Sequence, residues 1–475
     1  MAGPVSCGVH FSSLAFVVFL PCVYLAYWAL GRRAQNLLLL GASYLFYGWW
    51  DYRFLGLIVL SSAVDYAAGR GIRAAQSPGA KKRWLALSLL MNLGALGVFK
   101  YLGFGVASFA ALLEQLGVQA HLPTLRLVLP VGISFYTFQT LSYTIDVYRG
   151  RLEASERPLD FFTFVAFFPQ LVAGPIERAS ALLPQIAQVR SFDATRAADG
   201  ARQMLYGYLL KLVLADNLAP LVDQAFADPA QAGAWGLTWG SYAFAFQIYG
   251  DFAGYSHIAI GCARLFGIDL RRNFAYPYFS GDLVEFWRRW HMSLSTWFRD
   301  YVYVPLGGSR VTDARRRANV VLTFVLSGIW HGAGLNFVLW GLLHGVLVAA
   351  QGKRAPSDLD QPGGEGWSWW RALLTFHLVV ALWVLFRAPN LGVAAEVWAR
   401  ILRDIWSDPF VGPPLIPLLL VLACLGWEWL QRRRPHGFDL AHLPRPLRWV
   451  IYLGAVLALA ALGGVHQVPF IYFQF

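Results

Sequence analysis

Charged residues are scarce in this sequence. They occupy 14% of its 475 positions, against roughly a quarter in ordinary soluble domains. Hydrophobic residues occupy 57% of the positions. A soluble chain of this length would need more polar surface to face water. The composition therefore excludes an ordinary soluble protein and predicts an integral membrane protein.

Cysteine is rare as well, with four widely separated residues at positions 7, 22, 262 and 424. None has the spacing of metal ligands, so we expect no disulfide framework and no metal site. The sequence also lacks an internal repeat of fixed period, which argues against a transporter built from inverted repeats. Brief loops and the absence of a low-complexity tail predict one membrane domain over residues 1–475.

Long apolar runs recur along the chain, and about 20 apolar residues are enough to cross a hydrocarbon core of ~30 Å. We expect an all-α polytopic bundle with about 10–13 tilted transmembrane helices. The first run is followed by Arg32 and Arg33, so it is a retained span and not a signal peptide. The runs cover residues 11–30, 36–50, 54–68, 84–99, 101–117, 128–148, 160–174, 203–226, 235–266, 319–350, 368–387, 413–430 and 449–466.

The net charge of +12 comes from short basic clusters between the apolar runs. This distribution follows the positive-inside rule, so it points to membrane insertion and to anionic lipid, not to nucleic acid. The clusters at 315–317 and 432–434 should be cytoplasmic. The span that begins near Asn319 and the last span then both run outward, which places residues 469–475 on the extracytoplasmic side.

His331 is the most unusual polar residue because it lies inside an apolar run. It follows Arg317 by 14 residues, about 20 Å of helical rise, which puts it past the middle of the bilayer. Burial favours a neutral imidazole that can accept a proton. Gly328 and Gly332 would allow close helix approach and a local break around it. The residues alone leave two interpretations open: a proton acceptor beside a cavity, or a histidine hydrogen-bonded between helices. For His344, further along, a structural packing role is favoured. It would share a site with His331 only if the helix breaks between them.

The longest polar segment covers residues 271–318 and includes His291. Nine arginines face four acidic residues there, a net charge of +5. The apolar residues Phe286, Trp290, Leu294 and Trp297 fall on one face of a predicted amphipathic helix. One interpretation is a helix lying on anionic lipid. The other is a cytoplasmic site for the phosphates of an anionic substrate, with donor-binding candidates Arg288, Arg289, Trp290 and Arg299.

The segment at 468–475 is aromatic and uncharged. An interfacial aromatic belt explains its composition. The same short segment could instead fold back into a cavity from outside, and the residues leave both possibilities open.

Five separated motifs resemble the membrane-bound O-acyltransferase family, in the bacterial branch that O-acetylates exported polysaccharides such as alginate or cellulose. The resemblance covers nearly the whole chain. The motifs are N-L-L-L-L-G-A-S-Y-L-F-Y-G-W-W from Asn36, F-F-P-Q-L-V-A-G-P-I from Phe167, F-W-R-R-W-H-M-S-L-S-T-W-F-R-D-Y-V-Y-V-P-L-G-G from Phe286, G-I-W-H-G from Gly328 and P-F-I-Y-F-Q-F from Pro469.

This resemblance implies an enzyme of the bacterial inner membrane whose tilted helices form a ring around a tunnel. It makes His331 the catalytic histidine and His291 the second prominent one, on the cytoplasmic side. Tyr472 matches a tyrosine that related systems use as an acyl relay. The implied donor is acetyl-coenzyme A, used as a substrate with no further cofactor, and the implied partners are periplasmic acetyltransferase or export proteins.

We expect His331 to act as general base while an attacking hydroxyl adds to the thioester. The hydroxyl belongs to Tyr472 or to a periplasmic partner. Trp330, Asn336, Gly328 and Gly332 are candidates to line the tunnel, and Trp330, Asn336 or backbone amides are candidates to stabilise the oxyanion. Two rivals from other classes remain: a transporter or flippase of an acyl or lipid-linked substrate, and a non-catalytic scaffold for secretion. Release of free thiol from acetyl-coenzyme A distinguishes an enzyme from both.

Overall fold

The computed structural model describes residues 11–118, 127–352, 367–466 and 468–471. Regular structure in these ranges is helical throughout, which confirms the all-α prediction. Residue contacts divide the chain into two compact units. The first comprises Met1–Gly200 with Ala259–Arg271, and the second comprises Ala201–Ile258 with Arg272–Phe475.

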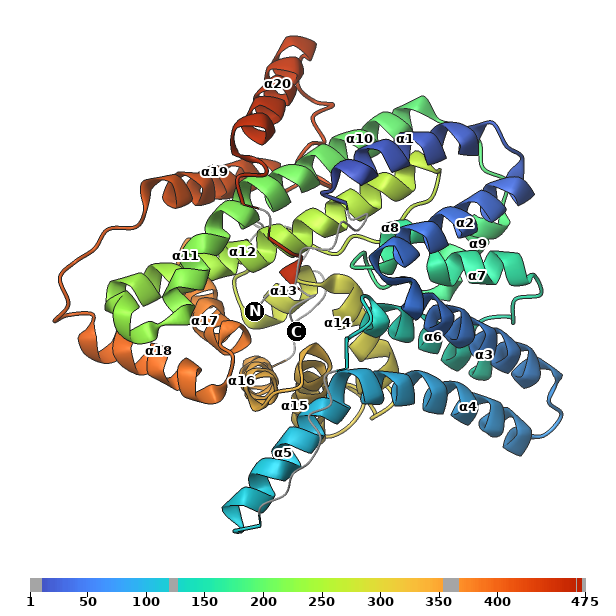
Figure 1. The fold of residues 1–475 in the computed structure, drawn as a ribbon, viewed down its shortest axis with the longest axis horizontal. Helices are drawn as coiled ribbons and strands as arrows, with labels where there is room; N and C mark the ends of the chain where they lie inside the picture. The colour runs from blue at the N-terminus through green and yellow to red at the C-terminus, as the bar shows by residue number, and fades with distance from the viewer. Residues whose placement is uncertain (1–10, 119–126, 353–366, 467, 472–475) are drawn as a thin grey trace. The chain divides into compact units, whose positions relative to one another are not determined.

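The helices of the first unit run from blue to teal in Figure 1. In chain order they are α1 (Leu14–Trp28), α2 (Arg32–Asp51), η1 (Tyr52–Phe54), α3 (Leu55–Ala74), α4 (Pro78–Leu96), η2 (Gly97–Tyr101), α5 (Leu102–Gln115), α6 (Ile133–Tyr148), α7 (Pro158–Ala166), α8 (Phe168–Leu171) and α9 (Ala179–Ala187). The boundary between the units falls inside α10 (Ala194–Tyr208) and α12 (Pro229–Leu265).

The remaining helices belong to the second unit, which holds all the predicted site residues. α12 is kinked at Gly233, whose φ is +65°. The helices are η3 (Leu209–Ala215), α11 (Asp216–Ala227), η4 (Pro277–Phe279), α13 (Leu283–Arg289), α14 (Met292–Phe298), η5 (Arg299–Tyr303), α15 (Asp313–His331), α16 (Leu335–Gln351), α17 (Trp369–Arg387), α18 (Leu391–Asp404), α19 (Leu415–Gln431) and α20 (Arg445–Leu462).

Several helices present broad apolar faces that no protein covers. On α1, Leu14 is 81% exposed, and on α20, Trp449 is 71% exposed and Val450 66%. Soluble monomers rarely expose contiguous apolar surface on this scale, whereas lipid requires it. Five helical stretches among the described residues are long and apolar enough to span a membrane: Arg32–Ala74, Pro78–Gln115, Ala194–Ala227, Trp369–Arg387 and Arg445–Leu462. The chain is therefore a polytopic membrane protein.

Two of the predicted apolar runs are not single helices. The run 160–174 divides into α7 and the one-turn α8, and Pro169 stands at the start of α8. The run 319–350 divides into α15 and α16. Hydropathy registers apolar length and not backbone breaks, so 160–174 was expected as one span. The run 319–350 was long enough for one tilted span or a broken pair, and the structure shows the broken pair.

A buried carboxylate organises the interior of the first unit. Asp65 on α3 accepts hydrogen bonds from Ser88 Oγ (2.5 Å) and Asn92 Nδ2 (2.9 Å), both on α4. Ser61 Oγ donates to Asn92 Oδ1 (2.7 Å), which extends the network. A carboxylate away from water is tolerated only when such partners satisfy its oxygens. These bonds fix α3 against α4.

The hairpin of α15 and α16 carries His331. The two helices lie side by side (Figure 1), and the chain between them is only three residues long. α15 ends because Gly332 adopts an extended backbone, with φ −160° and ψ 155°. The predicted break beside His331 is therefore present, and His331 is the last helical residue.

Candidate active site

His331 stands at the end of α15 inside a cage of aromatic rings. It is 5% exposed. The rings of Trp340 on α16 and Phe386 on α17 meet the imidazole edge to face, each with centroids 5.2 Å away. Trp330, the preceding residue, meets it at 4.9 Å. These contacts fix the ring plane and keep water out, so the site is dry and rigid.

Glycines allow α15 and α16 to approach closely enough to build this cage. A Cβ at Gly328 would overlap the Phe337 carbonyl oxygen, and a Cβ at Gly341 would overlap the Phe324 carbonyl oxygen. At Gly332 a Cβ would enter the Phe337 ring. The predicted small-residue interface is confirmed, and its role is to bring the two helices into backbone contact.

His291 lies in the turn between α13 and α14 and is completely buried. Its backbone is left-handed, with φ 44° and ψ 53°. Within the described part of the chain, Tyr276 and His291 are the non-glycine residues with positive φ. Left-handed backbone at a residue with a Cβ is unfavourable, and it persists only where the surroundings enforce it. The surroundings therefore hold the imidazole in place at the cost of an unfavourable backbone conformation.

Asn273 holds His291 and fixes its tautomer. The backbone N–H of Ser293 donates to Oδ1 of Asn273 (3.2 Å), which identifies that atom as the amide oxygen. Nδ1 of His291 lies 3.2 Å from the same oxygen. Because the oxygen can only accept, Nδ1 must carry the proton and donate. Nε2 then bears the lone pair. Nδ2 of Asn273 donates to Ser256 Oγ (3.0 Å), which fixes the amide in turn.

The surroundings of His291 keep it uncharged. It lies outside the candidate membrane spans. The rings of Phe252 and Phe274 pack against it, with centroids at 4.6 Å and 6.5 Å. Burial lowers the pKa of His291 to about 3. The imidazole is therefore neutral at physiological pH, as a hydrogen-bonding group or a base requires.

Trp330 connects the two histidines. Its ring centroid is 6.3 Å from that of His291 and 4.9 Å from that of His331. The structure therefore brings together two residues that are 40 positions apart in the sequence. The indole of Trp330 is 5% exposed.

His344 also packs on Trp340, with ring centroids 4.9 Å apart. Trp287 Nε1 donates to its Nδ1 (3.2 Å). The helix does break between His331 and His344, as sharing a site would require, and the two imidazoles contact the same indole. The packing interpretation of His344 fits these contacts.

The predicted amphipathic helix over Phe286–Trp297 is wrong as a continuous surface helix. α13 ends at Arg289 and α14 begins only at Met292. The four apolar residues of its expected lipid face are 1%, 2%, 2% and 6% exposed, and they pack inside the second unit: Phe286, Trp290, Leu294 and Trp297. The same apolar residues serve a protein core here, which a helical periodicity cannot distinguish from a lipid-facing stripe.

The donor-binding candidates divide into two pairs. Arg289 is buried and pairs with Glu285 (2.7 Å), so its charge is already neutralised. Trp290 stacks on Phe286 with ring centroids 5.5 Å apart. Neither residue is placed to bind a phosphate, because both lie in the core. Arg288 and Arg299 are exposed, and Arg299 Nε donates to Asp300 (2.8 Å).

Asn336 is buried at the start of α16, where it caps the end of α17. Its amide nitrogen donates to the carbonyl oxygens of Leu385 (3.1 Å) and Ala388 (3.0 Å). An amide nitrogen has two hydrogens, and both are used. The side-chain amide of Asn336 therefore has no N–H left for an oxyanion, so these contacts do not favour that role for the side chain.

Tyr472, the candidate acyl relay, lies outside the described residues, but the four positions 468–471 just before it are described. Phe470 and Ile471 are each 3% exposed. The ring of Phe470 packs on Tyr255, with centroids 4.4 Å apart, and lies 5.9 Å from Phe252, a ring that also touches His291. Of the two interpretations of this segment, inward folding fits these positions.

Charged residues that sequence reasoning missed hold this segment. Lys211 donates to the carbonyl oxygen of Val468 (2.9 Å), and Asp251 accepts from the N–H of Ile471 (2.6 Å). Lys211 and Asp251 each stand inside a predicted apolar run. Ionisable residues at membrane depth mark functional sites, and that signal would have identified both.

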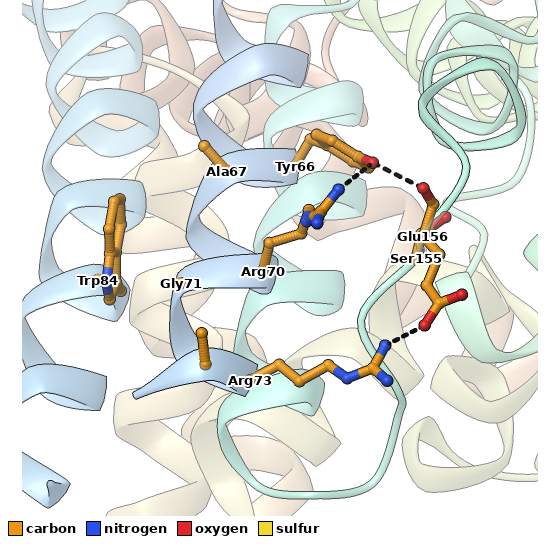
Figure 2. Close-up of a pocket in the computed structure, with 9 residues that line it drawn as sticks. Tyr66, Ala67, Arg70, Gly71, Arg73, Trp84, Ser155 and Glu156 are labelled. Carbon is orange, nitrogen blue, oxygen red and sulfur yellow. Dashed lines mark hydrogen bonds and ion pairs between the residues drawn. The ribbon is translucent and has the colours of Figure 1, made fainter. Parts of the chain in front are cut away.

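The first unit contains a surface cavity of about 880 Å³. Figure 2 shows Tyr66, Arg70 and Arg73 facing the loop that carries Glu156. Arg73 pairs with Glu156 (2.7 Å), and Tyr66 donates to its carbonyl oxygen (2.9 Å). Neither His291 nor His331 lines this cavity.

Two buried histidines lie against the same indole ring in an all-α membrane protein, and each imidazole can accept a proton away from bulk water. A family model described as the membrane-bound O-acyltransferase family matches residues 154–353, a range that contains both histidines. The protein is a membrane-embedded acyltransferase. More particularly, the chain belongs to the membrane-bound O-acyltransferase family.

Curated relatives match most of the chain. It is 42% identical to a probable alginate O-acetylase of Azotobacter vinelandii, over 82% of this chain and 77% of the relative. It is 36% identical to a protein of the same name from Pseudomonas putida, over 98% of this chain and 100% of the relative. A peptidoglycan O-acetyltransferase of Helicobacter pylori is 36% identical, over 81% of this chain and 78% of the relative. A transferase, and not a carrier or a scaffold, is the class that these matches define.

Proposed function

We propose that this protein transfers acetyl groups from cytosolic acetyl-coenzyme A, across the bacterial inner membrane, to an exported polysaccharide. The relatives act, by their names, on alginate and on peptidoglycan, which share sugar hydroxyls as acceptors. Alginate or cellulose is the polymer we favour, with a periplasmic partner completing the transfer. The observation that carries the proposal is the placement of His331, buried at a helix end beside a second neutral histidine.

The chemical step uses His331 as a general base. A hydroxyl oxygen attacks the thioester carbonyl carbon, and the imidazole takes the hydroxyl proton as the new C–O bond forms. The C–S bond then breaks, and the imidazolium returns its proton to the departing thiolate. The products are an acetyl ester and free coenzyme A, so the histidine is regenerated. The aromatic cage excludes water that would otherwise hydrolyse the thioester.

In this proposal His291, which also contacts Trp330, supports the step. Its tautomer presents the Nε2 lone pair, which can orient a donor group or a water without carrying charge. We propose that Arg288 and Arg299 meet the phosphates of acetyl-coenzyme A at the protein surface, and their exposure supports this role. We propose no metal and no cofactor beyond this donor substrate.

Thiol release tests the proposal directly. Purified protein incubated with acetyl-coenzyme A and a soluble acceptor should release free thiol in proportion to enzyme concentration. A carrier would move the thioester without cleaving it. If no thiol appears above the rate without protein, while the donor still binds, the enzymatic proposal fails.

Tyr472 is the acceptor hydroxyl that we propose for the first transfer, with the partner's polymer next in line. A phenol of pKa about 10 needs a base to become a nucleophile at neutral pH. The buried position of Phe470 and Ile471 supports an inward course for the residues just before it.

Tyr472→Phe keeps the ring and removes only the hydroxyl, so polymer acetylation should stop while protein level and insertion stay normal. Measurement of polymer acetate, with Tyr24→Phe as a matched control elsewhere in the chain, checks this. Acetylation at the wild-type level in Tyr472→Phe would make the tyrosine an anchor.

A further inference from the structure

Lys211 is a buried cation held by two carboxylates and a backbone carbonyl. Its side chain is 3% exposed, and it lies in the π-helical segment η3 of the candidate span Ala194–Ala227. The ammonium donates hydrogen bonds to Asp216 Oδ1 (2.7 Å) and to the Val468 carbonyl oxygen (2.9 Å). It also forms an ion pair with Asp251 Oδ1 (2.7 Å). One of the three partners belongs to the segment 468–471.

Asp251 connects the same group to that segment through its second oxygen. Oδ1 faces Lys211, and Oδ2 accepts from the backbone N–H of Ile471 (2.6 Å). One cation and two carboxylates leave this cluster with a net charge of −1 when all are ionised. Backbone N–H donors stabilise such an excess of negative charge, and hydrogen bonds to ionised groups are the strong ones. The segment thus supplies an acceptor for the cation and a donor for the anion.

The helices are shaped to bury this cluster. Gly254 on α12 faces the backbone of Gly207 and Lys211, and a Cβ there would come within 2.9 Å of the Lys211 backbone nitrogen and 2.7 Å of the Gly207 carbonyl oxygen. Two backbones can approach this closely only where side chains are absent. π-helical turns inside α-helices are frequent at functional sites, and this one carries Lys211. Burying ionised groups in a membrane span is unfavourable because they lose their hydration, so such a cluster indicates a functional role.

The position of the segment suggests that use. The side chain of Phe470 packs on Tyr255 and lies beside Phe252, and the ring of Phe252 meets His291 edge to face at 4.6 Å. The backbone on both sides of Phe470 is held by charge, through Val468 and Ile471. The segment therefore enters the second unit at a fixed register, one aromatic ring from His291.

We propose that Lys211 and Asp251 form a polar clasp that positions the segment 468–471 one aromatic ring from His291. Asp216 also pairs with Lys211 but makes no bond to the segment. The clasp itself stands on the contacts above, whereas its consequence for acetyl transfer rests on the proposed function. Lys211 and Asp251 are positioning residues in this proposal, since they act through the segment that precedes Tyr472.

Asp251→Asn tests the clasp because asparagine has one oxygen where Asp251 uses two. The variant must therefore lose either Lys211 or the Ile471 N–H. Asp216→Asn is the matched control, since Asp216 uses one oxygen on Lys211 and has no bond to the segment. Ile471→Pro removes the same hydrogen bond from the other side without touching the buried charges, and Ile471→Val keeps the N–H. Each purified full-length protein is first checked for a monodisperse elution profile.

Hydrogen–deuterium exchange of the C-terminal peptides is the primary measurement. In Asp251→Asn, exchange at residues 470–471 should become about 10- to 100-fold faster, as loss of a hydrogen bond to a charged group implies. Asp216→Asn should retain the wild-type rate. Ile471→Pro combined with Asp251→Asn should be no looser at Phe470 than either variant alone, because both remove one contact. Wild-type exchange rates in Asp251→Asn and at Phe470 of Ile471→Pro would overturn the clasp.

Acetyl transfer measured on the same samples separates the clasp from the proposed function. If exchange rises and kcat falls with an unchanged KM for acetyl-coenzyme A, the clasp positions a group that takes part in catalysis. If exchange rises and kcat is unchanged, the clasp stands and the participation of the segment in acetyl transfer is refuted. Slow exchange of the segment that is retained in Lys211→Arg but lost in Lys211→Met would support the charge-based contact. Equal exchange rates in the two variants would contradict it.

Discussion

At the scale of the residue, the site depends on a few hydrogen bonds that set the state of one imidazole. Asn273 presents a single oxygen to His291, to the Ser293 N–H and to Ser293 Oγ. The tautomer of His291 follows from that oxygen and not from the histidine itself. The sequence motif identifies His291, whereas its proton position is a property of Asn273.

Asn273→Ala should lower kcat by about tenfold or more, since a hydrogen bond of ~1.4 kcal/mol lost from the transition state slows a reaction tenfold. The KM for acetyl-coenzyme A should stay unchanged because Asn273 is fully buried and acts through His291. Ser256→Ala is the control, since it removes the support of the Asn273 amide nitrogen but leaves the oxygen in place. Steady-state kinetics on equal amounts of folded protein check this. Equal losses in both variants would deny Asn273 a role in setting the tautomer.

At the scale of the element, the α15–α16 hairpin shows how the spacing of glycines in the sequence determines helix packing. The glycines at 328, 332 and 341 predict close approach and a break, and both are present. Hydropathy alone marks 319–350 as apolar and does not locate the break, which the glycines do. The break between α13 and α14 was not predicted for a related reason. The left-handed turn at His291 contains no glycine or proline, the residues that usually mark a turn in a sequence. The surrounding hydrogen bonds impose that turn, and they involve Asn273, 18 residues away.

Gly341→Ala should lower the free energy of unfolding by about 1–3 kcal/mol, the range for overpacking a tight interface. Its Cβ would meet the backbone of Phe324, which cannot rotate away. Gly94→Ala on α4 is the matched control, because nothing lies within 4 Å of a Cβ there. That change should be neutral or should stabilise by about 0.5–1 kcal/mol through helix propensity. Thermal unfolding in detergent, followed by tryptophan fluorescence, measures both. A Gly341→Ala variant as stable as Gly94→Ala would contradict the close contact.

At the scale of the whole molecule, composition and motifs predict the class and the family of the protein, but they do not predict which distant residues contact one another. The all-α membrane class follows from scarce charge and recurring apolar runs, because lipid imposes both. The family follows from motifs that stay local in the sequence. The contacts of Ile471 with Asp251 and of Val468 with Lys211 span 220 and 257 residues, and no local pattern reports such a pairing. Long-range polar pairs of this kind require the fold.

The proposed recognition of the donor by surface arginines can be tested with two equivalent ion pairs. Arg299 pairs with Asp300 and is 61% exposed, and Arg403 pairs with Asp404 and is 70% exposed. Arg299→Glu should raise the KM for acetyl-coenzyme A about tenfold with little change in kcat, if its charge meets a donor phosphate throughout the cycle. Arg403→Glu should leave the KM unchanged. Equal donor kinetics in the two variants would remove Arg299 from the donor site.

The central claim is that His331 is the base for acetyl transfer, and one comparison of kcat tests it most directly. His331→Asn and His344→Asn each remove a buried imidazole that packs on Trp340. In His344→Asn, the new side-chain oxygen can still accept from Trp287. Thiol release from acetyl-coenzyme A should fall by 10²–10⁴-fold, the typical worth of general-base catalysis, in His331→Asn, and by less than about tenfold in His344→Asn. Near wild-type thiol release by a folded, membrane-inserted His331→Asn protein would contradict the account.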